Sequence, residues 1–329
     1  MLRTPRARLT GLALACGALV LTLLPAQSEA GGSHADPNVV NTGSRAAVRQ
    51  AYLDRWLPTE LNLMVTTGGS VGACRPFRSA ATSQRATAAA INFARGLVGE
   101  SAIRLVPRYD DLAARSALIM SANKALSHDP PHAWKCWSRT GHDAAGKSNI
   151  AITSMLPSAA DLARLYLDDD GSGNTAVGHR RWVLRPEATT MGSGNAAGSW
   201  FGNDLYVFTF GDDNAKAPAQ TYYAWPGAGW FPAPLEPGGR WSLSSSTGAS
   251  FAGARVTVTG PNGSSLPLTR RPVATGYADN TLVWDLRTPP AAVHGVAAPA
   301  YRVTVSGIKG APTTSYSYTV RLFDPTLPG

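Results

Sequence analysis

Acidic residues alternate with other residues in the stretch Asp168-x-Asp170-x-Ser172-Gly173, which runs on to His179. Its first six positions are typical of a calcium-binding loop, in which oxygen ligands alternate and a glycine makes the sharp turn. The twelfth position, where such a loop needs a bidentate glutamate, is His179. Aspartate and glycine are also ordinary turn residues. We therefore predict a turn here and not a calcium site.

A candidate nucleophile, Ser70, lies in the stretch Gly68-Gly69-Ser70-Val71-Gly72, which matches the Gly-x-Ser-x-Gly pattern of serine hydrolases. That motif needs a strand before it and a helix directly after it. Here Cys74 and Pro76 follow, and a proline argues against a helix at that point. The pattern predicts a flexible glycine loop.

Five short motifs follow one another between residues 88 and 194. They are the helical Asn92-Phe93-Ala94-Arg95, a helix end at Ser127-His128, Ser148-Asn149-Ile150-Ala151, Gly178-His179-Arg180-Arg181-Trp182, and Met191-Gly192-Ser193-Gly194. In this order they resemble the CAP superfamily (the cysteine-rich secretory, antigen 5 and pathogenesis-related proteins) in its bacterial secreted form. The resemblance covers residues 80–213. It implies an α-β-α sandwich with a central antiparallel sheet and a cleft that holds two histidines and two acidic residues.

The resemblance also implies which residues form the cleft. His128 and His179 match the two histidines, and Asp169 matches one acidic residue, with Asp168 as the alternative if the alignment shifts by one. Ser148 stands where the family has its second acidic residue. Members with the full set hold a divalent metal, so His128, His179 and Asp169 are candidate zinc ligands with water as the fourth. Because Ser148 is a poor ligand and a poor general base, the incomplete set favours hydrogen-bonding roles for the histidines over a strong metal site.

Three helical patterns precede a change of period near residue 178. Apolar spacing predicts a helix over 87–98, a second that Asp110 or Asp111 caps and whose buried stripe reaches Leu126, and a third that opens with Ser158 and Asp161 as a capping box. Residues 182–184, 190–193 and 205–210 have the pattern of short strands. Helices followed by strands predict an α+β fold. Residues 31–79 form an N-terminal extension with one short helix.

The sequence beyond residue 239 alternates apolar and polar residues, as strands with one buried face do. It predicts an all-β, immunoglobulin-like sandwich over 240–329. Residues 214–239 are rich in proline and glycine and are predicted to be a linker. Its neighbouring aromatic residues form either a sugar-stacking platform or, as we favour, packing between domains. They are Tyr222, Tyr223, Trp225, Trp230, Phe231 and Trp241.

Residues 1–30 have the pattern of an export signal, with three arginines, an apolar run over 11–24 and small residues before a cleavage site after Ala30. The run is shorter than the roughly 20 apolar residues that a spanning helix needs. We therefore predict a secreted or cell-wall-associated protein that does not span a membrane. Lipidation at Cys16 is the rival interpretation, although Ala13 stands where a lipoprotein signal prefers leucine.

After cleavage, Cys74 and Cys136 remain, and an even count in an oxidising compartment predicts a disulfide between them. Neither cysteine belongs to a Cys-x-x-Cys unit, which makes zinc binding by this pair the weaker alternative.

The formal net charge is +9, but basic residues do not cluster on one element, which argues against nucleic-acid binding. Such a charge gives weak attraction to anionic surfaces such as a cell wall. Three functions remain. The one we favour is binding of a small-molecule ligand (a lipid, a glycan or a divalent cation) in the two-histidine cleft. The others are a zinc-dependent hydrolase of peptide or glycan, and an interaction module whose β-sandwich contacts cell-wall polysaccharide.

Overall fold

A four-stranded sheet forms the centre of the first half of the protein, in a computed structural model that describes residues 36–210 and 220–328. Its strand order is β3-β5-β6-β4, with β5 and β4 antiparallel to β6 and β3 parallel to β5. Strand β4 is therefore an edge strand. The strands are β3 (Arg104–Leu105), β4 (Ser148–Thr153), β5 (Thr190–Ala197) and β6 (Phe201–Tyr206).

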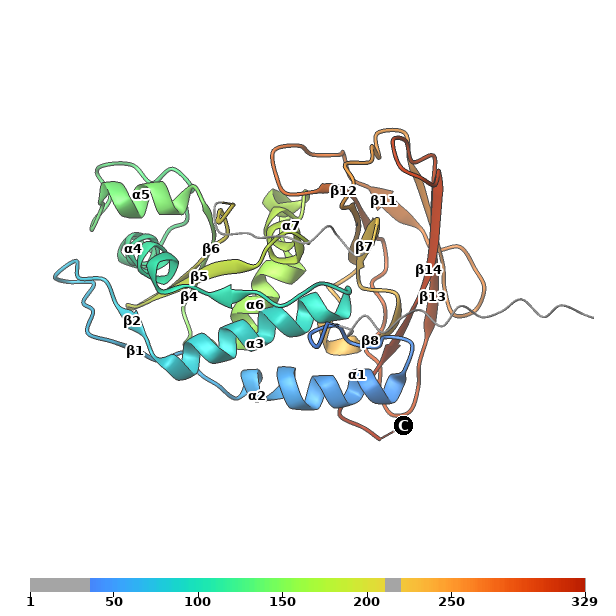
Figure 1. The fold of residues 1–329 in the computed structure, drawn as a ribbon, viewed down its shortest axis with the longest axis horizontal. Helices are drawn as coiled ribbons and strands as arrows, with labels where there is room; N and C mark the ends of the chain where they lie inside the picture. The colour runs from blue at the N-terminus through green and yellow to red at the C-terminus, as the bar shows by residue number, and fades with distance from the viewer. Residues whose placement is uncertain (1–35, 211–219, 329) are drawn as a thin grey trace, which may run out of the picture. The chain divides into compact units, whose positions relative to one another are not determined.

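Helices cover this sheet on both faces, with α4 and α5 on one side and α3 and α6 on the other (Figure 1). Glycines in the strands let α4 come close, because a side-chain carbon at Gly192, Gly194 or Gly202 would collide with its backbone. The Gly-x-Gly motif of β5 thus has a packing reason. The helical segments are α1 (Arg45–Ala51), the π-helical η1 (Tyr52–Trp56), α2 (Leu57–Glu60), α3 (Ala81–Leu97), α4 (Pro107–Asn123), α5 (Arg139–Ala145), α6 (Ala159–Asp168), the 3-10 turn η2 (Ser172–Asn174) and α7 (Gly178–Leu184).

The helix predictions hold best where the signal is local. Ser158 and Asp161 form the predicted capping box of α6. Helix α4 begins at Pro107, before the predicted cap Asp110, because proline suits the first helical turn. It ends at Asn123, so Leu126 lies outside it and is exposed.

The strand predicted over 182–184 is wrong, because these residues belong to helix α7. The carboxylate of Asp169 accepts hydrogen bonds from the backbone N–H groups of His179 and Arg180. Asp169 therefore caps the first turn of α7 from ten residues away. This contact stabilises a helix that the residues of α7 alone do not indicate.

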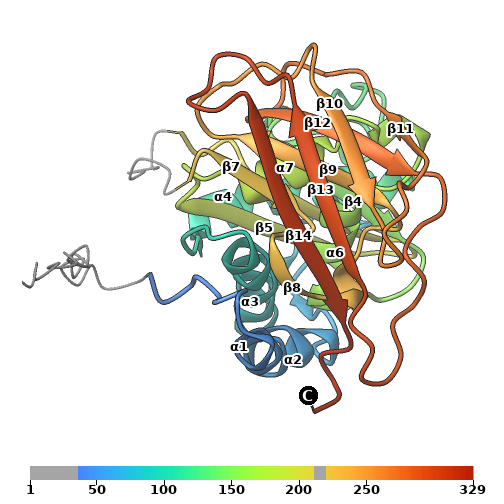
Figure 2. The same cartoon turned by 90° about the vertical axis from the view of Figure 1, so that its right-hand side faces the viewer.

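Two further four-stranded sheets lie face to face as a β-sandwich in the second half (Figure 2). Their facing sides share one hydrophobic core. Their orders are β10-β13-β14-β8 and β11-β12-β9-β7. The strands are β7 (Tyr222–Trp225), β8 (Gly229–Pro232), β9 (Arg240–Ser245), β10 (Arg255–Thr259), β11 (Leu268–Arg270), β12 (Asn280–Leu286), β13 (Ala300–Ser306) and β14 (Ser315–Phe323); the 3-10 turn η3 (Ala233–Leu235) follows β8.

The segment predicted to be a linker supplies two of these strands, β7 and β8. Its aromatic residues pack, as we favoured, since all but Trp230 are buried in the core. The fold is thus a mixed α+β arrangement whose two halves share a continuous core.

Two smaller features complete the first half. Cys74 and Cys136 form the predicted disulfide across 62 positions of sequence. Ser70 lies beside the two-residue strands β1 (Thr66–Thr67) and β2 (Arg78–Ser79), and no helix follows it in the described chain before Ala81, so the hydrolase elbow is not formed. No helix in the described parts of the chain is long and apolar enough to cross a membrane.

Candidate functional site

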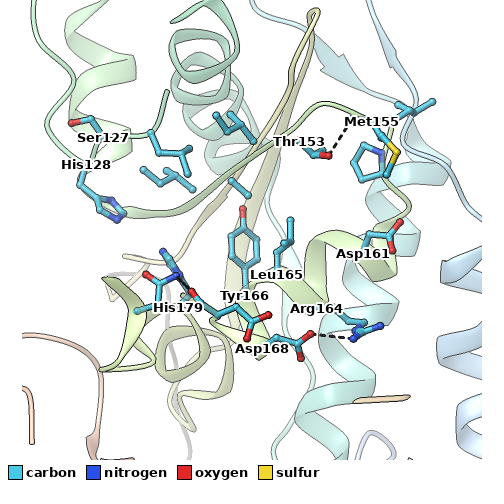
Figure 3. A pocket seen from close by; sticks show the side chains of 18 residues that line it. Ser127, His128, Thr153, Met155, Asp161, Arg164, Leu165, Tyr166, Asp168 and His179 are labelled. Atoms are coloured by element: carbon cyan, nitrogen blue, oxygen red, sulfur yellow. Dashed lines mark hydrogen bonds and ion pairs between the residues drawn. The ribbon is translucent and has the colours of Figure 1, made fainter. Parts of the chain in front are cut away.

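His128 and His179 lie together, although they come from different elements. His128 follows α4 in a loop, and His179 is in the first turn of α7. The centres of their rings are 6.2 Å apart, and both side chains line the same cavity (Figure 3). The structure therefore brings the two predicted cleft histidines into one site.

The hydrogen bonds of the two rings determine which ring nitrogen carries the proton. Nδ1 of His128 lies 2.9 Å from the carbonyl oxygen of Ala145, and Nδ1 of His179 lies 2.8 Å from Oδ1 of Asp169. A carbonyl or carboxylate oxygen only accepts, so Nδ1 is the protonated nitrogen in each neutral ring. Both rings are left with Nε2 as an acceptor.

Asp169, rather than Asp168, is the acidic residue at the histidines. Its side chain is fully buried and accepts three hydrogen bonds, from the ring and the backbone of His179 and from the backbone of Arg180. Its backbone is left-handed (φ 51°), and its carbonyl oxygen accepts from Nη1 of Arg240 in β9. Arg240 also donates to the carbonyl of Gly171, so the second half of the protein holds the turn that orients His179.

Ser148, the fourth predicted residue, is buried at the start of β4, and its hydroxyl donates to the carbonyl of Ala144. It lines a second hollow of about 320 Å³ that also borders both histidines. The four predicted residues are therefore neighbours in space, in three different roles.

A three-ligand zinc site does not form from these residues. Within 36–210 and 220–328, no three histidine, cysteine or acidic side chains come together in a way that could hold a metal ion. Both oxygens of Asp169 are occupied by donors from α7, so its carboxylate orients an imidazole instead of facing a metal. Residues near Gly173 form the predicted turn, since α6 ends at Asp168 and the 3-10 turn η2 follows at Ser172–Asn174.

The cavity beside the histidines has a volume of about 720 Å³ and lies between the loop that follows α4 and helix α6. One side is formed by residues 126–128, and the other by α6. Large apolar side chains are unusually exposed here: Leu126, Met155, Leu156 and Leu165 are 46%, 76%, 52% and 47% accessible. Exposed apolar residues gathered in one hollow are typical of a binding site.

Charged groups lie along α6 at the floor of the cavity (Figure 3). Arg164 pairs with Asp168 at 3.2 Å, and Asp161 and Asp170 are exposed. Burial raises the pKa of Asp168 to about 6, while Arg164 and Arg180 act in the opposite direction. One carboxylate oxygen of Asp168 has no hydrogen-bond partner in the described chain.

Two residues of the second half contribute to the site and were not predicted. Arg240 holds the turn at Asp169, and Tyr277 lines the second hollow and lies so close to Gly178 that a larger residue there would collide with its ring. Neither belongs to a recognisable motif, and both are reached only through the tertiary fold. No protein-family model and no curated protein sequence matches this chain.

Proposed function

We propose that the chain is an extracellular binding protein of CAP type, which holds its ligand in the cleft at His128 and His179. The order of the five sequence motifs supports the family assignment. The Cys74–Cys136 disulfide is compatible with an oxidising compartment. The observation that carries the proposal is the pairing of the two imidazoles at the wall of a 720 Å³ cavity.

The walls of the cleft indicate an amphipathic ligand. Exposed apolar side chains such as Leu126 and Leu165 would contact its apolar part. The Nε2 atoms of the histidines would accept hydrogen bonds from its polar part. A few placed polar groups within a mainly apolar lining are the usual composition of a ligand site.

We do not propose the zinc-dependent hydrolase. The donor set does not fit the ion, because Asp169 is committed to α7 and Ser148 is neutral. Two imidazoles alone would leave half of a tetrahedral shell to water.

The test is a ligand panel read by imidazole NMR. A fatty-acid analogue (cis-parinaric acid), a soluble cell-wall muropeptide and zinc chloride would each be titrated against the full chain. The fatty-acid analogue or the muropeptide should shift the ring signals of both His128 and His179 and leave the exposed His294 unchanged, whereas zinc chloride should not bind these rings tightly. His179→Ala should weaken that binding at least tenfold, with His294→Ala as the matched control. If neither the fatty-acid analogue, nor the muropeptide, nor any extended peptide shifts either cleft ring, the proposal is wrong.

A further inference from the structure

Strand β4 leaves half of its backbone groups without a strand partner. The backbone N–H of Val207 donates to the carbonyl of Lys147 at 3.0 Å, which fixes the alternation of the β4–β6 ladder. In that alternation Asn149, Ala151 and Thr153 bond β6, while the N–H and C=O groups of Ile150 and Ile152 point away from it. Nothing in residues 36–210 or 220–328 hydrogen-bonds those four groups.

This free edge faces the cavity. Four successive residues of β4, Ile150 to Thr153, line it. Successive side chains of a strand point to opposite faces of a sheet, so four in a row can border one cavity only along the backbone edge. The cavity is thus a groove along the edge of β4, between the loop at His128 and helix α6 (Figure 3).

The edge also lacks the usual protection against strand pairing. Exposed edges normally carry a proline, a lysine or an inward charge. The sequence of β4 is Ser-Asn-Ile-Ala-Ile-Thr, which has neither a charge nor a proline. Ile152 and Thr153 are half-buried at this edge and Ile150 is buried, so a partner strand would meet β4 first at Ile152.

We propose that the cleft takes an extended basic peptide, which adds to β4 as a further strand. This rests on the proposed binding function and names its ligand class. Ile150 and Ile152 would exchange up to four backbone hydrogen bonds with the peptide, as in other complexes formed by strand addition. Alternate side chains of the peptide would contact Leu126 on one wall and Leu165 on the other.

The charges of the groove favour a basic partner. Asp161, Asp168 and Asp170 line it against a single arginine, Arg164. Arg164 is already paired with Asp168 at 3.2 Å, so the exposed Asp161 and Asp170 are the carboxylates left to pair with a lysine or arginine of the peptide. The groove should therefore bind a basic peptide more tightly than an acidic one.

The first experiment uses capped nine-residue peptides in which valine alternates with lysine or threonine, selected from a library for binding to the full chain. Two versions of the best peptide would be N-methylated on alternate sets of backbone amides. The set that faces β4 should lose at least tenfold in affinity, and the other set should lose less than threefold. Equal losses of affinity in the two N-methylated peptides, or no loss in either, would overturn strand addition, because the two peptides carry the same side chains.

Hydrogen exchange locates the contact. Adding the peptide should slow hydrogen exchange of the Ile150 and Ile152 amides. The exchange rate of the Gly202 amide, which lies opposite Ile152 in β6, should not change. Ile152→Pro removes an N–H that bonds no strand, and it should abolish binding, whereas Ile152→Ala keeps the N–H and should bind within threefold of the native chain. If Ile152→Pro does not fold, the N-methylated peptides decide alone. Asp170→Asn should reduce the preference for lysine over threonine peptides.

The two proposals fail in different ways. If a lipid or glycan probe shifts the histidine signals and no peptide binds, the peptide proposal is wrong and the cleft still binds a ligand. If peptides bind without protecting Ile150 and Ile152, strand addition is wrong. If neither peptides nor the other probes reach the histidines, both proposals are wrong.

Discussion

Replacing Asp169 by asparagine should reverse the proton on the imidazole of His179. Oδ2 of Asp169 accepts the backbone N–H groups of His179 and Arg180, at 2.9 and 3.3 Å. In Asp169→Asn these two donors hold the amide oxygen in the same place, so the amide nitrogen faces Nδ1 of His179. A donor facing Nδ1 requires that nitrogen to be unprotonated. Nε2 then carries the proton and presents a donor to the cavity where the native ring presents an acceptor.

The cost in stability follows from the same bonds. Three hydrogen bonds to a charged carboxylate are replaced by neutral ones or rearranged, and each loses about 1 kcal/mol. The free energy of unfolding in urea should therefore fall by about 3 kcal/mol. Ligand affinity should fall together with the change of tautomer, because the cavity loses one of its two acceptors.

Two-bond 1H–15N NMR spectra distinguish the tautomers directly. In Asp169→Asn, His179 should change from the Nδ1–H to the Nε2–H form. His128 is an internal control, because its Nδ1 is held by the carbonyl of Ala145 and should remain protonated. If His179 keeps its proton on Nδ1 in the folded variant, the assignment of Asp169 as the group that orients this ring is wrong.

Three further changes test the scaffold in urea unfolding. Burial raises the pKa of Asp204 well above its usual range, so the folded state keeps a proton that the unfolded chain has lost. The free energy of unfolding should therefore fall as the pH rises from about 4. Asp204→Asn should flatten that fall between pH 5 and 8, and an unchanged slope would contradict this reasoning. Cys74→Ser with Cys136→Ser should cost about 4 kcal/mol, since the disulfide closes 62 positions; a loss below about 1 kcal/mol would refute this role. Arg240→Ala should cost about 2–4 kcal/mol by removing charged hydrogen bonds to the turn at Asp169, and Arg240→Lys should recover part of it.

Local patterns predicted those parts of the fold that depend on local interactions. The capping box at Ser158 and Asp161 lies within one turn of chain, and it was predicted correctly. The alternation of Val303 and Val305 in β13 likewise reflects one buried face of one strand. In each case the residues that decide the structure are neighbours in sequence.

The errors have non-local causes. Helix α7 is capped by Asp169, across a turn that Arg240 holds from a distant strand, and its own residues 182–184 have the pattern of a strand. Strands β7 and β8 were missed because their own segment is rich in proline and glycine. The strands that they pair with, β9 and β14, come later in the chain. The histidine pair was found through motif order, whereas Arg240 and Tyr277 had no sequence signal.

The two arginines that follow His179 limit how this protein can evolve. Arg180 and Arg181 are almost fully buried, and their guanidinium groups donate to oxygen atoms of residues 240, 242, 274, 278 and 279. If recombination exchanged the second half for an unrelated module, two buried cations would lose these acceptors, at a cost of several kcal/mol. The halves are therefore expected to be inherited together, and a gene that carries the first half alone should show substitutions at both arginine codons.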